Sequence, residues 1–314
     1  MPASTAITAA ICTYQRHELL EKAIDSLLAQ TLATDAEILV VDNSPPCAAG
    51  EALKRRYSAG DRVRYLIEPT PGLANARNVA ASQASSPLIA YIDDDAIARP
   101  DWLEQVVRAF HSFGGEAGVV GGRVLPLWTT QRPSWLPDEL LTALTIVDWG
   151  GSLRLAKPSE PMAGTNLSFR VEALQATGGF SMSLGRVGLG HVLLSNEDTD
   201  LVQGLERMGH KTVWAPDAVV EHLVHPDRLQ QRWFRSRMAW QAVSDLLTGS
   251  PDIDLDVERY WRGLAAFVSE LPPRHRTPRG LFQEIDDPEL FSRQVHAIYG
   301  LTMLSLLGFH RGDD

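Results

Sequence analysis

The chain has 314 residues, of which 44% are hydrophobic and 22% are charged, and this composition excludes disordered, collagen-like and coiled-coil proteins. With 29 Lys and Arg against 39 Asp and Glu, the formal net charge is −10, which repels phosphate backbones and excludes nucleic acid as the expected partner. Only Cys12 and Cys47 are present, so we expect no disulfide framework, no cysteine-rich zinc site and a reducing, cytoplasmic compartment.

The N-terminus lacks the basic residues that open a secretory signal peptide, and it runs directly into a strand-like segment. From there, short apolar runs alternate with segments of helical periodicity. This alternation predicts an α/β protein with a Rossmann-like, mostly parallel twisted sheet flanked by helices. The expected strands are 7–12, 38–41, 63–67, 88–92 and 117–124, and the expected helices are 19–28, 73–84 and 102–110.

The second half of the chain opens with an irregular segment, 126–161, that is rich in Pro, Trp and Gly. After it we expect strands at 165–170 and 211–215, and helices at 171–177, 198–208, 229–247, 261–268 and 291–307. The apolar stretch from Ile298 to Phe309 is shorter than the roughly 20 residues of a membrane span, so no span is predicted.

Polar clusters follow three of the predicted strands. They are Thr13 to Arg16, Asp42 with Asn43, and Asp93 to Asp95. In a parallel sheet, ligands bind beyond the carboxyl ends of the strands. We therefore expect these clusters to converge on one edge of the sheet and to form a site there.

The run Asp93-Asp94-Asp95 has two interpretations. Adjacent carboxylates repel unless a cation lies among them, and Mg²⁺ or Mn²⁺ takes such oxygen ligands together with substrate phosphates. Alternatively, the three residues form a polar strand end or an N-cap for the helix that begins near Pro100.

A second acidic cluster, Ser195 to Asp200, opens a predicted helix. Carboxylates at this place can cap the helix and complement its dipole. One of them can also act as a general base if it stays ionised within reach of an acceptor hydroxyl.

Taken in order, several segments resemble family 2 glycosyltransferases. In the first half they are Ala10 to Arg16, Val40 to Ser44, Gly72 to Asn78 and Tyr91 to Asp95. In the second half they are Gly164 to Arg170, Gly178 to Phe180 and Asn196 to Asp200. Independent matches in sequence order are more specific than any one short motif.

The resemblance implies a GT-A fold in a catalytic domain, residues 1–225, with a nucleotide-sugar-binding half (1–125) and an acceptor-binding half (126–225). Residues 226–314 are expected to form a helical extension. By similarity, the donor site would include Thr13, Tyr14, Arg16, Asp42, Arg77, Asp93 and Asp94. Asp42 would accept a hydrogen bond from the base, and Arg77 would contact the base or the phosphates.

The same resemblance implies the chemistry. Asp93 and Asp95 match the acidic positions of a DxD element that binds Mn²⁺ or Mg²⁺, and His222 would complete the metal shell, with His225 as a competitor. Asp198 would be the catalytic base of an inverting transfer, and Glu197 would orient it or contact the acceptor. No covalent intermediate is needed.

For the acceptor, the resemblance and the aromatic content indicate Trp149, Gly179 and Phe180. Trp128, Trp135 and Trp149 could form a stacking platform for a sugar or could pin a loop to the core. The glycine-rich segment Gly185 to Gly190 could be a lid, or simply a turn.

The extension also leaves alternatives. Its Arg-rich helix after Pro226 could rest on anionic lipid as a peripheral membrane contact, or could pack through Trp233 and Trp240 with its Arg side chains solvated. The apolar stretch from Phe291 to Leu307 has the same two interpretations and a third, as a homodimer contact.

The leading hypothesis is a metal-dependent glycosyltransferase that moves a sugar from a nucleotide-diphosphate sugar to a hydroxyl of a saccharide, lipid-linked or small-molecule acceptor. One alternative is a sugar-phosphate nucleotidyltransferase, which would normally carry a glycine-rich phosphate loop that Thr13 to His17 does not supply. Another is a non-catalytic nucleotide-sugar-binding module, against which the Glu197-Asp198 pair argues.

Overall fold

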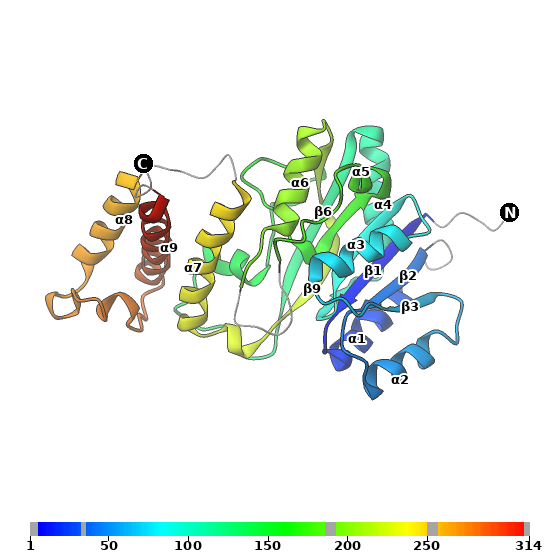
Figure 1. Cartoon of the computed structure of the whole chain (residues 1–314), viewed down its shortest axis with the longest axis horizontal. Helices are drawn as coiled ribbons and strands as arrows, with labels where there is room; N and C mark the ends of the chain where they lie inside the picture. Colours follow the sequence, from blue (N-terminus) through cyan, green and yellow to red (C-terminus); the bar gives the residue numbers. More distant parts are fainter. Residues whose placement is uncertain (1–5, 33–35, 186–192, 250–256, 311–314) are drawn as a thin grey trace. The chain divides into compact units, whose positions relative to one another are not determined.

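The computed structural model describes residues 6–32, 36–185, 193–249 and 257–310 (Figure 1). Its strands are β1 (Ile7–Thr13), β2 (Ala36–Asp42), β3 (Val63–Ile67), β4 (Leu88–Asp93), β5 (Ala96–Ala98), β6 (Ala117–Trp128), β7 (Arg154–Leu155), β8 (Leu167–Arg170) and β9 (Lys211–Val224). Its α-helices are α1 (His17–Leu28), α2 (Ala48–Tyr57), α3 (Leu73–Gln83), α4 (Trp102–Phe113), α5 (Val171–Ala176), α6 (Glu197–Arg207), α7 (Gln231–Thr248), α8 (Val257–Glu270) and α9 (Pro288–His310).

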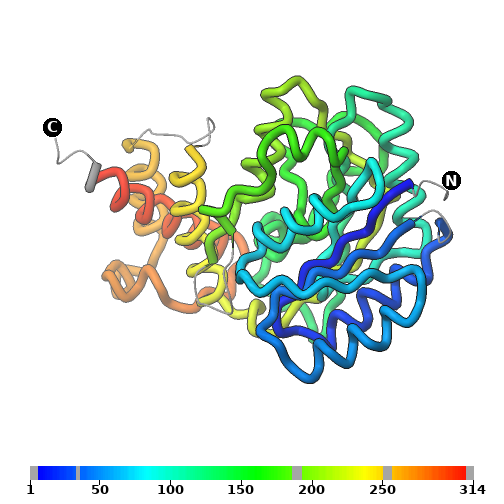
Figure 2. Tube along the Cα trace, turned by 45° about the vertical axis from the view of Figure 1, so that its right-hand side comes forward, coloured from blue at the N-terminus to red at the C-terminus, as the bar shows by residue number. Residues whose placement is uncertain are grey.

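The strands form one sheet in the order β3-β2-β1-β4-β8-β6-β9-β5, and β7 pairs with β9. The β3, β2, β1 and β4 strands are parallel to one another, as the alternating sequence predicts, and their blue and cyan traces lie side by side in Figure 2. Beyond β4 the pairing changes, because β8 is antiparallel to both β4 and β6. The fold is therefore α/β with a mixed sheet.

Apolar residues alternate along the strands and supply two cores, one on each face of the sheet. On one face, Ile7, Ala9 and Ile11 pack with α1, α2 and α4. On the other, Ala10, Leu39 and Val41 pack with α3, α5 and α6. Both faces of the parallel strands are thus covered, which explains why their sequences are almost continuously apolar.

Several elements differ from the sequence-based expectations. The last strand extends from Lys211 to Val224 instead of ending at 215, so His222 lies within a strand. The expected strand at 165–170 begins as a 3-10 turn, Gly164–Asn166, before β8. Sequence analysis missed α2 and β5, because α2 buries few side chains and β5 has only three residues.

By its internal contacts, the chain divides into two compact units. One comprises Met1–Leu127, Thr145–Leu189 and Glu197–Leu223, and the other comprises Trp128–Leu144, Gly190–Asn196 and Val224–Asp314. The sheet unit therefore excludes 128–144, which sequence analysis assigned to the acceptor half. A separate catalytic domain ending at 225 stays a prediction.

In the second unit, α9 packs against both α7 and α8. Trp135 meets Phe234 and Phe291 edge to face, which fits a core role for this tryptophan better than a stacking platform. Arg235 of α7 is buried and pairs with Glu284, so the expectation that all Arg side chains of this helix are solvated is wrong at that position. Membrane and dimer contacts of these helices stay predictions.

Within the described ranges, none of the helices has both the length and the apolar character that a membrane crossing requires.

One buried side chain joins several segments of the sheet unit. Asn166 accepts a hydrogen bond from the Trp102 indole at 2.8 Å and donates to the carbonyls of Arg123 (2.9 Å) and Ala218 (2.8 Å). Gly122 leaves room for this amide, because a Cβ there would collide with it and with the Ala218 carbonyl. Asn166 thus fixes the turn that precedes β8.

We expect the substitution Asn166→Ala to destabilise the sheet unit by about 3 kcal/mol or more, because it leaves the buried indole and two carbonyls unpaired. Urea unfolding followed by fluorescence measures the change. The control is Asn75→Ala, which removes an amide hydrogen bond to the Thr70 carbonyl at an exposed site. Equal midpoints for the two variants would contradict the role given to Asn166.

Candidate active site

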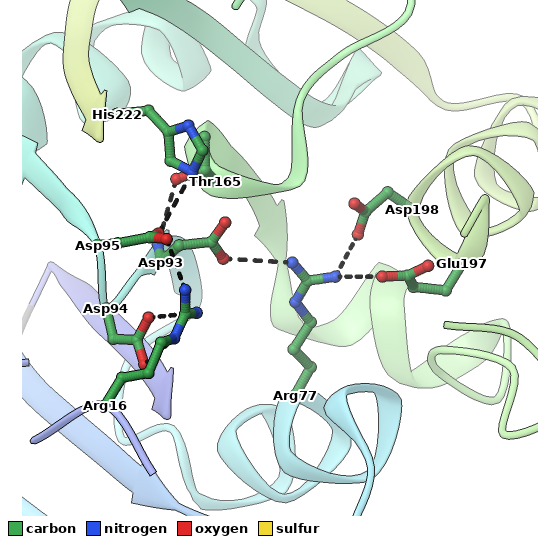
Figure 3. Close-up of polar contacts among 9 residues, drawn as sticks. All are labelled: Arg16, Arg77, Asp93, Asp94, Asp95, Thr165, Glu197, Asp198 and His222. Carbon is green, nitrogen blue, oxygen red and sulfur yellow. Dashed lines mark hydrogen bonds and ion pairs between the residues drawn. The ribbon is translucent and has the colours of Figure 1, made fainter. Parts of the chain in front are cut away.

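The carboxyl ends of β1, β2 and β4 meet at one edge of the sheet. Strand register aligns Thr13 with Asp42 and Cys12 with Asp93. The polar clusters that follow these strands are therefore neighbours, as the parallel topology requires. Figure 3 shows the centre of the resulting site, where side chains from β4, α3, α6 and β9 point toward one another.

Asp93, Asp95 and His222 form a compact group. One potential ligand atom from each lies within 4.8 Å of the others, and His222 Nε2 is 3.3 Å from Asp95 Oδ1. Register explains the encounter: β5 follows Asp95 directly, and its first residue, Ala96, pairs with His222 of β9. Strand β5, which the sequence did not predict, thus brings His222 close to Asp95.

The donor set of this group fits a divalent cation. Two carboxylates and an imidazole are ligands that Mn²⁺ and Mg²⁺ sites use, with imidazole favouring Mn²⁺. His222 is almost fully buried, and its Nδ1 has no hydrogen-bond partner among the described residues. His225, the competing candidate, is not a member of the group.

Asp94, between Asp93 and Asp95, is not part of this group and has different partners. It is fully buried, accepts a hydrogen bond from the Thr13 hydroxyl at 2.6 Å and pairs with Arg16, whose Nη2 lies 2.5 Å from Asp94 Oδ1. Burial raises the pKa of the Asp94 carboxyl to about 7, although Arg16 opposes the rise. Arg16 also reaches Asp95 Oδ2 at 2.5 Å, so it ties the acidic turn to the end of β1.

Arg77 of α3 lies at the centre of the site and is almost fully buried. Its Nη1 is 2.6 Å from Asp198 Oδ1 and 3.2 Å from Glu197 Oε1, and its Nη2 is 3.7 Å from Asp93 Oδ1. Burial disfavours the guanidinium charge, but these three carboxylates outweigh it and raise the pKa of Arg77. The structure thus gives Arg77 partners that the sequence did not indicate, and its contact with a nucleotide stays a prediction.

Asp198 differs from its neighbour in exposure. Its side chain is 21% exposed, against 8% for Glu197. Burial raises the pKa of the Asp198 carboxyl to about 7, with Arg77 opposing the rise and Glu197 adding to it. Such a group changes its protonation near neutral pH, which suits a general base.

Asp42 lies in a separate cluster of polar groups at the end of β2. The Tyr65 hydroxyl donates to its Oδ2 at 2.6 Å, His17 Nε2 lies 2.9 Å from the same oxygen, and the Ser44 amide donates to its Oδ1 at 3.0 Å. Burial opposes ionisation, but the hydrogen bonds prevail and lower the pKa of Asp42. An ionised acceptor at this place agrees with the predicted contact to a base, which stays a prediction.

The expected acceptor residues have different surroundings. Phe180 is buried, and the Arg77 guanidinium lies 5.3 Å from its ring centroid, so Phe180 supports the arginine from beneath. Gly179 has a positive φ of 84°, and a Cβ there would collide with Asn78. Trp149 is half-buried and donates to the Pro161 carbonyl at 3.1 Å. Tyr14, expected in the donor site, is half-buried. Direct contacts of all four with substrate stay predictions.

The expected lid falls largely on 186–190, which lies outside the described residues. Its first residue, Gly185, is described and has a φ of 84°. A Cβ on it would lie 3.2 Å from Glu197 Cδ, so the chain passes close to the acidic pair here.

Sequence reasoning missed the residues that organise the site without forming motifs of their own. Thr165 accepts a hydrogen bond from the Asp93 amide, and Tyr65 and His17 hold Asp42. Thr165 lies in a segment that was identified, Gly164 to Arg170, so its neighbourhood could be predicted. Nothing in the spacing indicates Tyr65 or His17.

The mixed sheet and its flanking helices form the GT-A fold, which solved glycosyltransferases share. The mannosyltransferase PcManGT from Pyrobaculum calidifontis, solved in complex with GDP-Man and Mn²⁺, superposes with a TM-score of 0.62 at 18% identity, over 95% of this chain and 86% of its own. TarS from S. aureus, solved in complex with UDP, gives 0.54 at 15% identity, over 97% and 92%.

Sequence comparison identifies the family. Residues 8–174 match Glycosyl transferase family 2, and the chain belongs to this family. It is 27% identical to the glucosyl-dolichyl phosphate glucuronosyltransferase of Haloferax volcanii over 98% of this chain and 96% of that protein. It is also 27% identical to the succinoglycan biosynthesis protein ExoM of Rhizobium meliloti, over 72% and 70%.

The backbone of Gly164 lies against the side chains of Asp198 and Arg77. A Cβ built on Gly164 would fall inside the van der Waals distance of Asp198 Oδ2 and would lie 2.8 Å from Arg77 Nη2. We expect the substitution Gly164→Ala to displace both groups and to lower the rate of glycosyl transfer about 100-fold, since a shift of about 1 Å has that effect in other active sites.

The matched control is Gly151→Ala, because a Cβ at Gly151 meets nothing within 4 Å. Both variants are assayed for transfer and for thermal unfolding. A Gly164→Ala enzyme as active as the control would show that Asp198 and Arg77 need not hold the positions described here.

Proposed function

We propose that this family 2 enzyme transfers a sugar from a nucleotide-diphosphate sugar to an acceptor hydroxyl with inversion, with a divalent metal at Asp93, Asp95 and His222 and with Asp198 as general base. The observation that carries the proposal is the arrangement around Arg77. The group of Asp93, Asp95 and His222 lies on one side of the guanidinium, and the Asp198 carboxylate, which is 21% exposed and has a raised pKa, lies on the other.

The charge balance supports the metal. Among the residues drawn in Figure 3, the carboxyl groups of Asp93, Asp94, Asp95, Glu197 and Asp198 face the two guanidinium groups of Arg16 and Arg77. This excess of negative charge favours a cation. Bound at Asp93, Asp95 and His222, a divalent ion would neutralise the charge of the departing diphosphate. Mn²⁺ in the mannosyltransferase structure supports the same choice of ion.

For the acceptor side, the proposal assigns the protein's own groups. Asp198 Oδ2 would take the proton of the acceptor hydroxyl as its oxygen attacks the anomeric carbon from the face opposite the diphosphate. Arg77 holds Asp198 through Oδ1, and Glu197, more deeply buried on the same guanidinium, helps to fix that arginine. Because attack is direct, no glycosyl-enzyme intermediate forms.

The relative that matches along almost its whole length acts, by its name, on a glucosyl-dolichyl phosphate. This supports a lipid-linked saccharide as the first acceptor class to test. The name of this relative also favours a glycosyltransferase over the two alternatives, a sugar-phosphate nucleotidyltransferase and a non-catalytic binding module.

The metal assignment predicts that Mn²⁺ tightens nucleotide binding in a way that depends on its ligands. In isothermal titration with UDP or GDP, we expect Mn²⁺ to strengthen binding to the native chain, and we expect Asp95→Asn and His222→Ala to remove at least about 10-fold of that gain. The control is Asp217→Asn, an exposed acidic position on β9. Equal Mn²⁺ dependence in all four proteins would exclude this metal site.

The base assignment predicts a pH dependence. Because burial raises the pKa of Asp198 to about 7, and a base must be ionised, kcat/KM should rise about 10-fold per pH unit below pH 7 and level off above it. Asp198→Asn should bind nucleotide normally and lose transfer, whereas Asp200→Asn, in the same first turn of α6, should keep both. If Asp198→Asn still transferred sugar, and if its kcat/KM fell at low pH as in the native enzyme, Asp198 would not be the base.

A further inference from the structure

One side chain of α3 fastens the turn that runs from Gly178 to Phe180. Asn78 Nδ2 donates to the Phe180 carbonyl at 2.9 Å, and the Phe180 amide donates to Asn78 Oδ1 at 2.8 Å. This reciprocal pair joins residues that are 102 positions apart in the sequence. Two hydrogen bonds to one planar amide fix the orientation of the turn as well as its distance, which a single bond would not do.

The backbone of the turn is suited to this contact. Gly178 and Gly179 have φ values of 86° and 84°, in a region that residues with a Cβ rarely adopt. A Cβ on Gly179 would also collide with the Asn78 amide. Glycine at both positions therefore lets the backbone approach Asn78, and Phe180 follows at the point that the two hydrogen bonds hold.

The residue held by Asn78 carries the ring that contacts Arg77. The guanidinium carbon of Arg77 lies 5.3 Å from the Phe180 ring centroid, over the face that attracts a cation. Tyr91 and Phe169 meet Phe180 edge to face, with centroids 5.5 and 5.9 Å away. The Tyr91 hydroxyl also donates to the Arg77 carbonyl at 2.8 Å. Both the core and the turn thus give the Phe180 ring a fixed position next to the guanidinium.

A fixed position matters for this guanidinium because it pairs with carboxylates of both groups of the site. Arg77 Nη1 is 2.6 Å from Asp198 Oδ1, and Nη2 is 3.7 Å from Asp93 Oδ1. Arg77, Asn78, Phe180 and Asp198 all belong to the same compact unit, so this chain of contacts lies within it. A displaced arginine would leave Asp198 without the partner that holds its Oδ1.

We propose that Asn78 is a positioning residue: through its two hydrogen bonds with Phe180 it holds the ring against Arg77, and Arg77 in turn holds Asp198. The inference rests on the proposed function, because Asp198 needs a fixed place only if it does the chemistry. Phe180, which the resemblance indicates as an acceptor contact, thereby has a role that requires no contact with the acceptor.

The first test follows Arg77 itself and needs no substrate. In full-length protein with isotope-labelled arginine, NMR measures hydrogen exchange of the Arg77 guanidinium, and Arg77→Lys identifies its signal. We expect Asn78→Ala and Phe180→Leu each to speed this exchange at least about 10-fold, because the guanidinium loses the ring that confines it. The double variant should exchange no faster than Phe180→Leu, since both substitutions act through the same ring.

The second test measures glycosyl transfer. With a UDP- or GDP-linked sugar as donor and a lipid-linked saccharide as acceptor, we expect Asn78→Ala and Phe180→Leu each to lower kcat about 10-fold. The double variant should lose no more than Phe180→Leu does, whereas two separate structural defects would add. Thermal unfolding of every variant separates a loss of rate from a loss of folded protein.

The matched control is Gln30→Ala. Gln30 Nε2 donates to the Arg99 carbonyl at 2.7 Å, and its Oε1 accepts from the Leu103 amide at 3.0 Å, so its amide also bridges two backbone groups. Gln30 belongs to the same compact unit, but it follows α1, which packs on the opposite face of the sheet from α3. We expect this variant to keep the exchange of Arg77 and kcat within about twofold of the native values.

Three outcomes overturn the inference: native exchange of Arg77 in Asn78→Ala, an equal change of that exchange in Gln30→Ala, or additive effects in the double variant. Failure of the proposed function looks different, because Asp198→Asn would then retain transfer. In that case faster exchange in Asn78→Ala would still support the link from Asn78 to Arg77, and native exchange would reject it.

Discussion

The site depends on one buried charge, the guanidinium of Arg77. An uncompensated ion at that depth costs several kcal/mol, so the arginine requires its carboxylates as much as they require it. Its partners come from three separate segments: Asp93 ends β4, Glu197 and Asp198 begin α6, and Phe180 lies beneath the guanidinium. Folding these segments around Arg77 brings the proposed donor and acceptor chemistry together before any ligand binds.

Strand register brings together the second group of the site, Asp93, Asp95 and His222. Asp95 meets His222 because β5, three residues long, pairs with the distal part of β9. A shift of one residue in that pairing would turn the histidine to the opposite face of the sheet. The length of β9 therefore has a functional consequence, since a strand ending at 215 would leave His222 in a loop without a fixed direction.

How far the sequence predicts this molecule depends on whether a feature is local. Apolar runs and helical spacing located β1 to β4 and most helices, and the parallel topology then placed Thr13, Asp42 and Asp93 at one edge. Partners distant in sequence were not predictable: Arg77 and Asp198 are separated by more than 100 positions, and periodicity reports burial without naming the neighbour. The same reason hid the hydrogen bonds of Asn78 with Phe180, although the segments that carry the two residues were evident.

The acidic turn also shows why two interpretations of one motif can hold together. Asp94 does the structural work, since it is fully buried and joined to Thr13 and Arg16, while Asp93 and Asp95 face His222 and Arg77. The capping alternative fails, because α4 begins at Trp102 with Asp101 as its N-cap. Three consecutive aspartates cannot all surround one cation when the chain turns between them. Because Asp94 is held in the interior by Arg16 and Thr13, Asp93 and Asp95 remain on the side where a metal and a diphosphate would lie.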